Sequence, residues 1–587
     1  MDEDQKRLLE ELLFSGEEKL SFAKMLYFGV FHSPSAFPHY KPNDEEQAFT
    51  DDYVKRLDSW ATENIDADKI DREASIPDSV IQGLKDIKLL GITAPKEYGG
   101  LGRSQYSYCK AMENLASHCA STALFVNVHH SIGLRALVLF GTDEQKNKWL
   151  PSLTSGEKIA AFSLTEEKAG SDASGVETRA EYVPEKKAYR LNGMKQWTTN
   201  GSIADILTVM AQTTVDTPRG PEDKITAFLV TPDMPGFIVR NPALEKVGMR
   251  GTKTANLAFE DMLVPEENVL GPIGGGLRVC LTVLDYGRVT FGATCTGAGK
   301  YLVEKALEHA SQRHQFKRPL ASFPLVKKKL SLMSAMAYAM DATTYLTASL
   351  VDRGLEEFML EAAILKVFNS DCVWTMLYDT MQIYGGRSFF TDQPFERMMR
   401  DARLNTIGEG SNEVLRAFIA LIGIRDVGMQ FKHVSEAFSH PISEFKHIKG
   451  FGRQCLNYVR NPDVPVQSDL LKEEAAKLGK CIRKFSVAVA RLLSKYRENI
   501  VEKQLSLDRI STSVMAIYTT TAVLSKLDGR IQEKGLDPKV LKDELATGKF
   551  YCHYAFALIE EQLGSLFSNC DEEIESLSDQ LSGVGIV

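Results

Sequence analysis

The stretch MMRDARLNTIGEGSNEVLRAFIALIG at 398–423 places one carboxylate, Glu409, between two glycines at the start of an amphipathic helix. Ser411 and Asn412 favour helix N-caps, and the apolar residues after them recur at helical spacing: Val414, Leu415, Phe418, Ile419 and Ile422. The helix therefore opens its free N–H groups and positive dipole end toward Glu409, which favours an anion there. From these residues alone, Glu409 is either an ordinary loop glutamate or a catalytic base.

Two further segments change the interpretation of Glu409. They are AAFSLTEEKAGSDASG at 160–175 and LNGMKQWTTNG at 191–201. Other motifs follow in order: GLGRSQYSYCKAMENLA at 100–116, LDYGRVTFGA at 284–293, RHQF at 313–316 and QIYGG at 382–386. Over essentially the whole chain these motifs resemble the acyl-CoA dehydrogenase family, whose patterns TEPxAGSD, WITNG and YEGT correspond to SLTEEKAGSD, WTTNG and GEGSN here.

Changes in composition and in hydrophobic periodicity divide the chain into five parts. Residues 1–45 form an N-terminal arm expected to lie on the first domain, and 46–158 show amphipathic helical periodicity. Short β-branched runs separated by turns predict a β-barrel or sandwich at 159–275. Helical periodicity returns at 276–424, as in a bundle, and continues in a C-terminal helical domain at 425–587. The fold class is thus mainly α with a central β-barrel domain, and the resemblance implies an acyl-CoA dehydrogenase-like fold with an extra C-terminal domain.

Composition excludes several other classes of protein. The chain has 587 residues, 44% of them hydrophobic, which is enough for three or four domains. With 69 basic and 78 acidic residues, the net charge of −9 gives no reason to expect nucleic acid. The nine cysteines are scattered without a CxxC pair, so we expect reduced thiols and no metal site. The first twenty residues are acidic, unlike a transit peptide, and no run of eighteen apolar residues is present, so we expect a soluble or peripheral protein.

The chemistry implied by the resemblance needs one base and one hydride acceptor. Removing two hydrogens from an unactivated Cα–Cβ bond requires a base for the α-proton and a sink for the β-hydrogen, and a carboxylate with FAD supplies both. Glu409 is the candidate base, and desolvation between substrate and flavin is expected to raise its pKa. Some relatives place the base immediately before the arginine of LDYGR, where this chain has Gly287, so Glu409 remains the candidate.

The resemblance also assigns the binding residues. Positions expected to bind FAD are Phe162, Leu164, Thr165, Ser171, Trp197, Thr198, Thr199, Arg313, Phe316, Gln382, Gly385, Gly386, Ser411 and Glu413. Among them, those in RHQF and QIYGG are expected to reach the FAD of a neighbouring subunit, so the active unit would be at least a dimer. Positions expected to bind the acyl-CoA are Ser171, Asp285, Arg288, Glu409 and Gly410.

At a few positions the chain departs from the family pattern. Gly408 stands where an aromatic residue usually precedes the base, and Ser388 replaces a later glycine of the GGxGF-like motif. TEEKAG replaces TEPxAG, and Lys327 stands where long-chain relatives often have glutamine. These differences bear on substrate shape and activity more than on fold.

The extra 425–587 region and phrases such as KIDREASIPD, PKEYGGLG and EKQLSLDRIS resemble one subgroup, very-long-chain acyl-CoA dehydrogenase and acyl-CoA dehydrogenase family member nine. The resemblance implies a mitochondrial homodimer, on the matrix side of the inner membrane, that oxidises long-chain acyl-CoA in β-oxidation and passes electrons to electron-transfer flavoprotein. Two alternatives stay open. One is a respiratory complex I assembly factor that retains the fold, and the other is an acyl-CoA oxidase, although SGVGIV lacks the usual peroxisomal signal.

The segment 431–460 mixes aromatic and aliphatic residues with lysine and arginine. Such a mixture suits a peripheral helix in an anionic membrane interface. The alternative is that the same apolar residues pack on the helical core.

Overall fold

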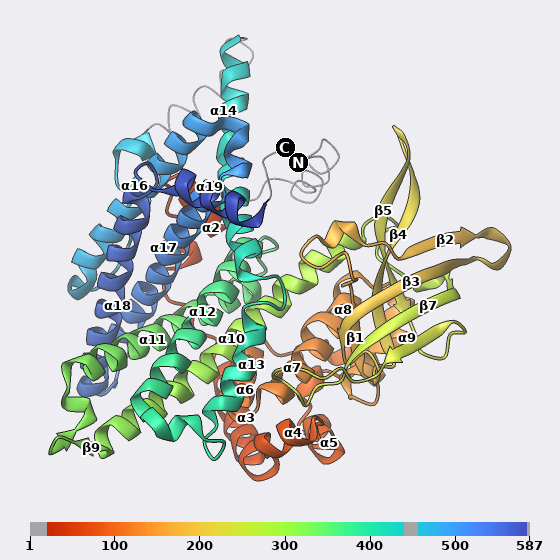
Figure 1. The fold of residues 1–587 in the computed structure, drawn as a ribbon, viewed down its shortest axis with the longest axis horizontal. Coiled ribbons are helices and arrows are strands. Elements are labelled where there is room, and N and C mark those ends of the chain that lie inside the picture. Colours follow the sequence, from red (N-terminus) through yellow and green to blue (C-terminus); the bar gives the residue numbers. More distant parts are fainter. Residues whose placement is uncertain (1–19, 440–455, 584–587) are drawn as a thin grey trace. The chain divides into compact units, whose positions relative to one another are not determined.

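A computed structural model describes the backbone of residues 20–439 and 456–583, and the side chains of 20–430 and 456–583. The described residues form two compact units. Residues 41–411 are unit 1, and residues 20–40 together with 412–439 and 456–583 are unit 2. Figure 1 shows that unit 1 combines helices with a large β-sheet, whereas unit 2 is helical in its described residues. This confirms the predicted fold class.

Unit 1 begins with helices that enclose their own apolar core. They are α3 (Asp44–Asn64), α4 (Ala67–Glu73), α5 (Asp78–Asp86), α6 (Gln105–His118), α7 (Ala120–Asn127), α8 (Arg135–Phe140) and α9 (Asp143–Thr154). Side chains define where they start: Asn43 accepts the Glu46 N–H at 2.8 Å before α3, and Thr142 and Gln145 form a capping box at α9. Tyr108, Met112 and Phe125 are among the residues buried between them.

One helical run in this region resembles a membrane span by composition. Among the described residues, Ala120–Phe140 is long and apolar enough to cross a membrane, yet 72% of it is buried inside the protein. Its middle, Val128–Leu134, is π-helical and packs against β1 and α10. A buried apolar run of this kind is a core helix, and it brings Asn127 and Ile132 into the interior of unit 1.

The sheet of unit 1 supplies the β domain. Its strands are β1 (Ala160–Ser163), β2 (Arg179–Val183), β3 (Ala188–Thr199), β4 (Ile206–Thr217), β5 (Gly220–Val230), β6 (Phe237–Asn241), β7 (Thr254–Pro265) and β8 (Val269–Leu270). They lie in the order β6-β7-β3-β2-β4-β5-β8, and β1 pairs with β4 in parallel. Alternating buried positions such as Leu207 and Val209 form the apolar face of the sheet. The loop after β1 carries the TEEKAGSD motif, and the WTTNG motif spans the end of β3 and the turn after it.

Four helices form the bundle of unit 1. They are α10 (Gly276–Gln312), α11 (Pro324–Asp352), α12 (Met359–Tyr384) and α13 (Phe395–Asn405). The long helix α10 packs against α12, α11 and α6, so the middle of α10 is buried on several sides. A small hairpin of β9 (His314–Gln315) and β10 (Arg318–Pro319) follows α10. The arrangement places Asp285–Arg288 inside the unit and Arg313 at its surface.

In its described residues unit 2 is helical, and its main helices come from two separate parts of the chain. These are α2 (Phe22–Tyr27), α14 (Asn412–Ser439), α16 (Lys472–Tyr496), α17 (Gln504–Ile531), α18 (Pro538–Gly564) and α19 (Asp571–Ser582). α17 packs against α14, α16 and α18. Tyr27 of α2 donates to the Ile419 carbonyl at 2.8 Å, and Gly423 leaves room for the Tyr27 ring, since a Cβ there would lie 2.2 Å from it.

These contacts change two expectations about domain organisation. The sequence led us to expect the N-terminal arm on the first domain, whereas residues 20–40 belong to unit 2, where α2 packs against α14, α16 and α17. The expected boundary at 424 falls inside α14, which continues to Ser439, and the compact units divide between Ser411 and Asn412. Most of the 431–460 segment lies outside the residues whose side chains are described. At its described end, Leu456 is 64% and Val459 80% exposed.

Candidate active site

Glu409 lies in the turn between α13 and α14, with its backbone in the left-handed region. Its φ is 57°, and that of Gly410 is 94°. A non-glycine residue is strained there by about 1–2 kcal/mol, so neighbouring groups must hold it. Two buried cations do so. Arg288 Nε donates to the Glu409 carbonyl oxygen at 3.3 Å, and Lys366 Nζ donates to that of Gly410 at 2.7 Å. Helices α10 and α12 therefore hold the backbone carbonyls of residues 409 and 410 in place.

The Glu409 carboxylate is held at one oxygen and unpaired at the other. Asn127 Nδ2, at the end of α7, donates to Oε1 at 3.0 Å. Oε2 is buried and has no hydrogen-bond partner among the described residues. Burial raises the pKa of Glu409 to about 7, although Arg288, Lys366 and the Asn127 hydrogen bond each act to lower it. A carboxylate with this pKa and one unpaired oxygen can accept a proton near neutral pH.

Other buried ionisable groups surround Glu409. Arg288 Nη1 lies 2.9 Å from Asp285 Oδ1 on α10, and both side chains are buried. Burial raises the pKa of Asp285 to about 7 against the attraction of Arg288. Burial likewise lowers the pKa of Lys366 to about 8 against the attraction of Glu409. Arg288 attracts both acids and Lys366 attracts Glu409, so two buried cations offset part of the cost of burying the two carboxylates.

The two segments of the β domain that the sequence predicts to bind FAD lie together. The Gln196 N–H donates to the Thr165 carbonyl at 2.8 Å, and the hydroxyls of Ser163 and Thr198 are 2.8 Å apart. A buried ion pair also joins the two segments, with Lys195 Nζ 2.6 Å from Glu166 Oε1. The loop after β1 is therefore tied to the end of β3.

The predicted residues on these segments differ in exposure. Phe162 and Thr198 are buried, Leu164, Thr165 and Thr199 are half-buried, and Ser171 is exposed. Trp197 is 62% exposed and has a φ of 56°, so its ring is presented at the surface by a strained backbone. An exposed aromatic face of this kind is available to pack against a planar ligand.

A chain of contacts connects this region to Glu409. Asn200, in the turn after β3, is buried, and its Nδ2 donates to the Phe125 carbonyl of α7 at 3.3 Å. Two residues later on α7, Asn127 donates to Glu409. The WTTNG turn and the GEGSN turn thus contact the same short helix from two elements far apart in sequence.

A second group of predicted FAD positions lies where α10 and α12 end, away from the β domain. It consists of Arg313, Phe316, Gln382, Gly385 and Gly386. His309 of α10 stacks on Tyr384 of α12 with ring centroids 4.0 Å apart, which brings the two ends together. Phe316 is 89% exposed, and Arg313 and Gln382 are also exposed. A Cβ at either glycine would meet nothing within 4 Å, so the backbone there is open to a ligand. No contact joins these residues to Glu409 among the described residues.

The last two predicted FAD positions flank the start of α14. Ser411 is half-buried immediately before the helix, and Glu413 is exposed in its first turn. Acidic residues are favourable in a first turn because of the helix dipole. Glu413 therefore has a structural reason to be there that does not require a cofactor.

Two of the residues that surround Glu409 had no role from sequence. Asn127 is a polar residue inside the apolar run 122–133, and that interruption was its only signal. Lys366 lies within α12 in a stretch that otherwise looks like core. Nothing in the spacing of either residue indicated that it would reach the turn at 409–410.

The departures from the family pattern have local explanations in two cases. Ser388 is buried and its hydroxyl reaches the carbonyls of Met381 and Gly385, at 2.9 and 2.8 Å, so it closes the end of α12. At Gly408 a Cβ would lie 3.4 Å from Leu404, which is ordinary contact, so the turn does not require glycine there. Lys327 is exposed on α11.

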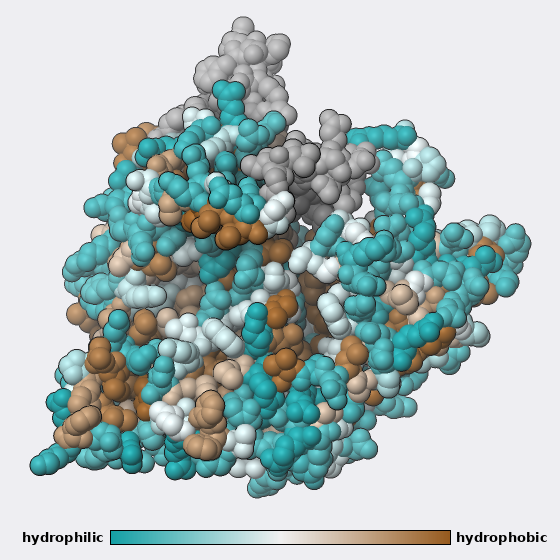
Figure 2. All heavy atoms as spheres, viewed as in Figure 1, coloured by the Kyte–Doolittle hydropathy of each residue, from teal (hydrophilic) through white to brown (hydrophobic). Residues whose placement is uncertain are grey.

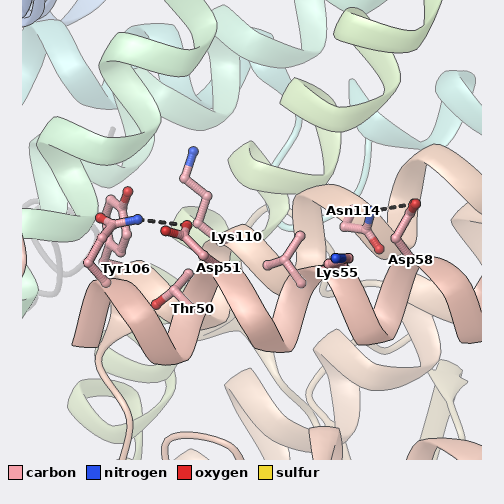
Figure 3. A pocket seen from close by; sticks show the side chains of 9 residues that line it. Thr50, Asp51, Lys55, Asp58, Tyr106, Lys110 and Asn114 are labelled. Carbon is pink, nitrogen blue, oxygen red and sulfur yellow. Dashed lines mark hydrogen bonds between the residues drawn. The ribbon is translucent and has the colours of Figure 1, made fainter. Parts of the chain in front are cut away.

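A polar groove on unit 1 lies away from these residues. Figure 3 shows it between α3 and α6, with Asp51, Lys55 and Lys110 among its lining side chains. Asn114 Nδ2 donates to Asp58 Oδ1 at 2.8 Å across it. Its lining includes no residue that contacts Glu409. The groove is therefore separate from the candidate site.

Comparison with known proteins identifies the family. Family models match in order along the chain: acyl-CoA dehydrogenase N-terminal domain at 43–157, middle domain at 161–262, C-terminal domain at 274–422, and ACAD9/ACADV C-terminal domain at 469–584. Very long-chain specific acyl-CoA dehydrogenase, mitochondrial, of Bos taurus is 33% identical over 94% of this chain and 85% of its own. The chain belongs to the acyl-CoA dehydrogenase family.

Relatives outside mammals show the same relationship. Probable acyl-CoA dehydrogenase FadE10 of Mycobacterium bovis is 30% identical and covers 99% of this chain and 91% of its own. A crystal structure of an acyl-CoA dehydrogenase complexed with FAD from Bacillus anthracis is 27% identical, covers 95% of both chains and has a TM-score of 0.75. This acyl-CoA dehydrogenase is therefore an FAD-dependent oxidoreductase that acts on CH–CH bonds.

The residues present in this acyl-CoA dehydrogenase fit that cofactor. A flavin needs an aromatic or apolar surface for its ring system and cations or free N–H groups for its phosphates. Groups of the right chemistry are present: Trp197 would offer an exposed ring to the flavin, and at a separate place Arg313 with the open backbone of Gly385 and Gly386 would offer a cation and N–H groups to phosphates.

Proposed function

We propose that the protein converts long- or very-long-chain acyl-CoA to trans-2-enoyl-CoA, with Glu409 as the base. The observation that supports this most is the carboxylate itself, which is buried, bound at Oε1 and unpaired at Oε2. Burial raises its pKa to about 7, which suits a general base at neutral pH. A structural glutamate in the same place would be expected to have both oxygens satisfied.

The proposed reaction divides two hydrogens between two acceptors. Glu409 Oε2 takes the α-proton as the Cα–Cβ double bond forms, and the β-hydrogen leaves as hydride. FAD, when bound, supplies the acceptor for that hydride. Arg288 and Lys366 hold the 409–410 backbone in its strained turn, so the base does not have to be ordered when substrate arrives.

We assign the residues that bind FAD and acyl-CoA from the positions that resemble the family motifs. The residues proposed to contact the flavin side of FAD are Phe162, Leu164, Thr165, Ser171, Trp197, Thr198 and Thr199. Ser411, just before α14, and Glu413, in its first turn, are also assigned to FAD. Arg313, Phe316, Gln382, Gly385 and Gly386 reach the FAD of a second subunit. Ser171, Asp285, Arg288 and Gly410 line the acyl-CoA site around Glu409. The hydrogen bonds between 165 and 196 and between Asn200 and Phe125 support the first of these groups.

We further propose a homodimer. Large apolar side chains are exposed near the ends of α10, α11 and α12, namely Phe316, Leu325, Tyr378, Phe389 and Phe390, with exposures from 60% to 89%. Figure 2 shows hydrophobic atoms at the β9 end of unit 1. Exposed apolar groups gathered in one region are typical of a protein interface. A second copy there would also bring the Arg313 group to its partner's cofactor.

The names of the relatives support a proposal for the cellular setting. Names such as very long-chain specific and mitochondrial belong to proteins 33% identical to this chain. We propose the same substrate class, a place on the matrix side of the inner membrane in fatty acid β-oxidation, and electron-transfer flavoprotein as the electron acceptor. No observation in the described residues favours the complex I assembly role.

Anaerobic titration of the yellow protein with acyl-CoA of increasing chain length tests the proposal. Bleaching of the flavin by palmitoyl-CoA or longer substrates is expected, and reoxidation by electron-transfer flavoprotein should be faster than by air. Unchanged absorbance with every chain length would favour the assembly role. Rapid peroxide release in air would instead indicate an oxidase.

A further inference from the structure

We propose that Asn127 is the positioning residue of the base: it binds Glu409 Oε1, leaves Oε2 free for the α-proton and holds the carboxylate in its ionised, reactive form. This inference rests on the proposed function of Glu409. The contact is a hydrogen bond of 3.0 Å between residues 282 positions apart. It joins α7 of the N-terminal helices to the turn after α13.

The surroundings of Asn127 make a polar residue there hard to explain by packing. Asn127 is 1% exposed and ends α7 where the chain becomes π-helical. Its neighbours Phe125, Val126 and Val128 are buried and apolar. Asn127 Oδ1 has no hydrogen-bond partner among the described residues. A half-satisfied buried amide is unfavourable, and a leucine of similar volume would avoid that cost. What the amide contributes is its hydrogen bond to Glu409.

The other polar neighbours of Glu409 act on different atoms. Arg288 and Lys366 donate to main-chain carbonyls of the turn, so they orient the backbone. Of the side chains described, Asn127 is the one whose hydrogen bond reaches the carboxylate. Rotation of the carboxylate about its last bond would exchange its oxygens, and a hydrogen bond to Oε1 opposes that rotation.

A donor to the carboxylate also favours its charged form, so loss of Asn127 is expected to raise the pKa of Glu409. Other ionisable groups on the helices around Glu409 can also contribute to a pH profile. Asp285 and Arg288 lie on α10, and Lys366 lies on α12. The pKa values of Asp285 and Lys366, about 7 and about 8, are near that of Glu409. Burial keeps Tyr108 of α6 and Cys295 of α10 neutral there by raising their pKa values. His129 and His130, which follow Asn127 in the chain and bond elsewhere, are also kept neutral, because burial lowers their pKa values.

Two variants of the FAD-bound protein test the role. In Asn127→Leu the donor is lost at similar volume, and in Asn127→Asp it is replaced by a second acid of the same shape. The acidic limb of the kcat/KM profile is expected to move up by about one pH unit in Asn127→Leu and further in Asn127→Asp, where like charges repel. kcat at the alkaline plateau should fall about tenfold, with KM changing less, because the carboxylate is less well oriented.

A second readout does not depend on turnover. The infrared carbonyl band of the protonated Glu409 carboxyl, assigned by its loss in Glu409→Gln, is titrated with pH in the substrate-free protein. The band is expected to persist to higher pH in both Asn127 variants. If no acyl-CoA reduces the flavin of the wild-type protein, the proposed function is wrong. The infrared titration still tests the hydrogen bond between Asn127 and Glu409 in that case.

Asn268→Leu is the matched control. Asn268 is also buried, and its Nδ2 donates to the Leu229 carbonyl at 2.8 Å in the β domain. The control is expected to lose thermal stability without moving the Glu409 band or the pH profile. An unmoved band in Asn127→Leu or, where that variant does not fold, in Asn127→Asp would overturn the proposal. An equal shift in Asn268→Leu would overturn it too, because the effect would then be a general consequence of losing a buried amide.

Discussion

Gly287 lies against the carboxylate of Glu409. A Cβ at position 287 would come within 3.2 Å of Glu409 Oε2 and 2.9 Å of Ile132 Cγ2. This stretch of α10 therefore lies beside the Glu409 carboxylate. In this chain the glycine leaves room for the unpaired oxygen.

Gly287→Ala is therefore expected to slow flavin reduction about tenfold, because the methyl group displaces the carboxylate from its resting place. The gain in helix propensity offsets part of the packing strain, so the melting temperature should change by only a few degrees. Stopped-flow reduction and a thermal melt measure the two effects. Gly299→Ala, on the same helix but facing the flexible end of Met340, should be reduced at the normal rate. Normal reduction of Gly287→Ala would show that the oxygen is not crowded there.

Glu409→Gln is expected to keep FAD and lose substrate reduction by about 1,000-fold or more, since an amide cannot accept the α-proton. The isosteric change retains the side-chain volume, so the absorbance ratio of flavin to protein should match wild type. Anaerobic stopped-flow with palmitoyl-CoA gives the rate. Turnover within a few-fold of wild type would remove Glu409 from the role of base.

The same variant tests the raised pKa through stability. The pKa of Glu409 is about 7 in the folded protein against 4.5 ordinarily, so the folded state binds more protons between these values. Stability is thus present below pH 4.5 and decreases as pH rises toward 7, by about 1–3 kcal/mol from this group. Glu409→Gln should lose that contribution to the pH dependence. Its melting temperature relative to wild type is expected to be higher at pH 8 than at pH 5, and a difference independent of pH would contradict the shift.

Arg313→Ala is expected to lower FAD occupancy, because it removes an exposed cation from the group at the ends of α10 and α12. Arg313→Lys should restore part of it. Occupancy after gel filtration, measured from the flavin absorbance, distinguishes the variants. Arg219→Ala, in the exposed β4–β5 hairpin, serves as a control for loss of a surface arginine. Full flavin retention in Arg313→Ala would argue against the contact.

Periodicity and motifs predicted the order of helical and β regions, because amphipathic helices and alternating strands are encoded locally. They also indicated Glu409, since a carboxylate between glycines before a helix is a local pattern. The groups that hold Glu409 could not be predicted in the same way. Asn127, Arg288 and Lys366 come from three helices that meet only in the folded unit, and the hydrogen bonds they make depend on that packing.

The N-terminal arm shows the same limit. The sequence led us to expect that residues 1–45 form an arm on the first helical domain. In the structure, Tyr27 instead packs over Gly423 and α2 joins the helices of unit 2. The complementarity of a tyrosine ring and a glycine almost 400 residues later leaves no trace in local periodicity.

The last prediction concerns the segment 431–460. Its sequence mixes apolar residues with lysines: Phe438, Phe445, Ile448 and Phe451 with Lys446 and Lys449. At the described end of the segment, Leu456 and Val459 are exposed. Hydrophobic insertion together with attraction to anionic lipid predicts binding to cardiolipin-containing vesicles that salt weakens without abolishing. A triple change of Phe445, Ile448 and Phe451 to Ser should reduce flotation with these vesicles several-fold.

The control for that experiment is a similar loss of exposed apolar surface elsewhere in unit 2. Ile574, Leu577 and Leu581 of α19 are 47%, 57% and 80% exposed on an acidic helix that anionic lipid should repel. Changing these three to Ser is expected to leave flotation at the wild-type level, because they bring apolar area without positive charge. Equal flotation of wild type and the 445/448/451 variant would show that this segment is not the anchor. A loss in the α19 variant alone would move the membrane contact to the C-terminal helix.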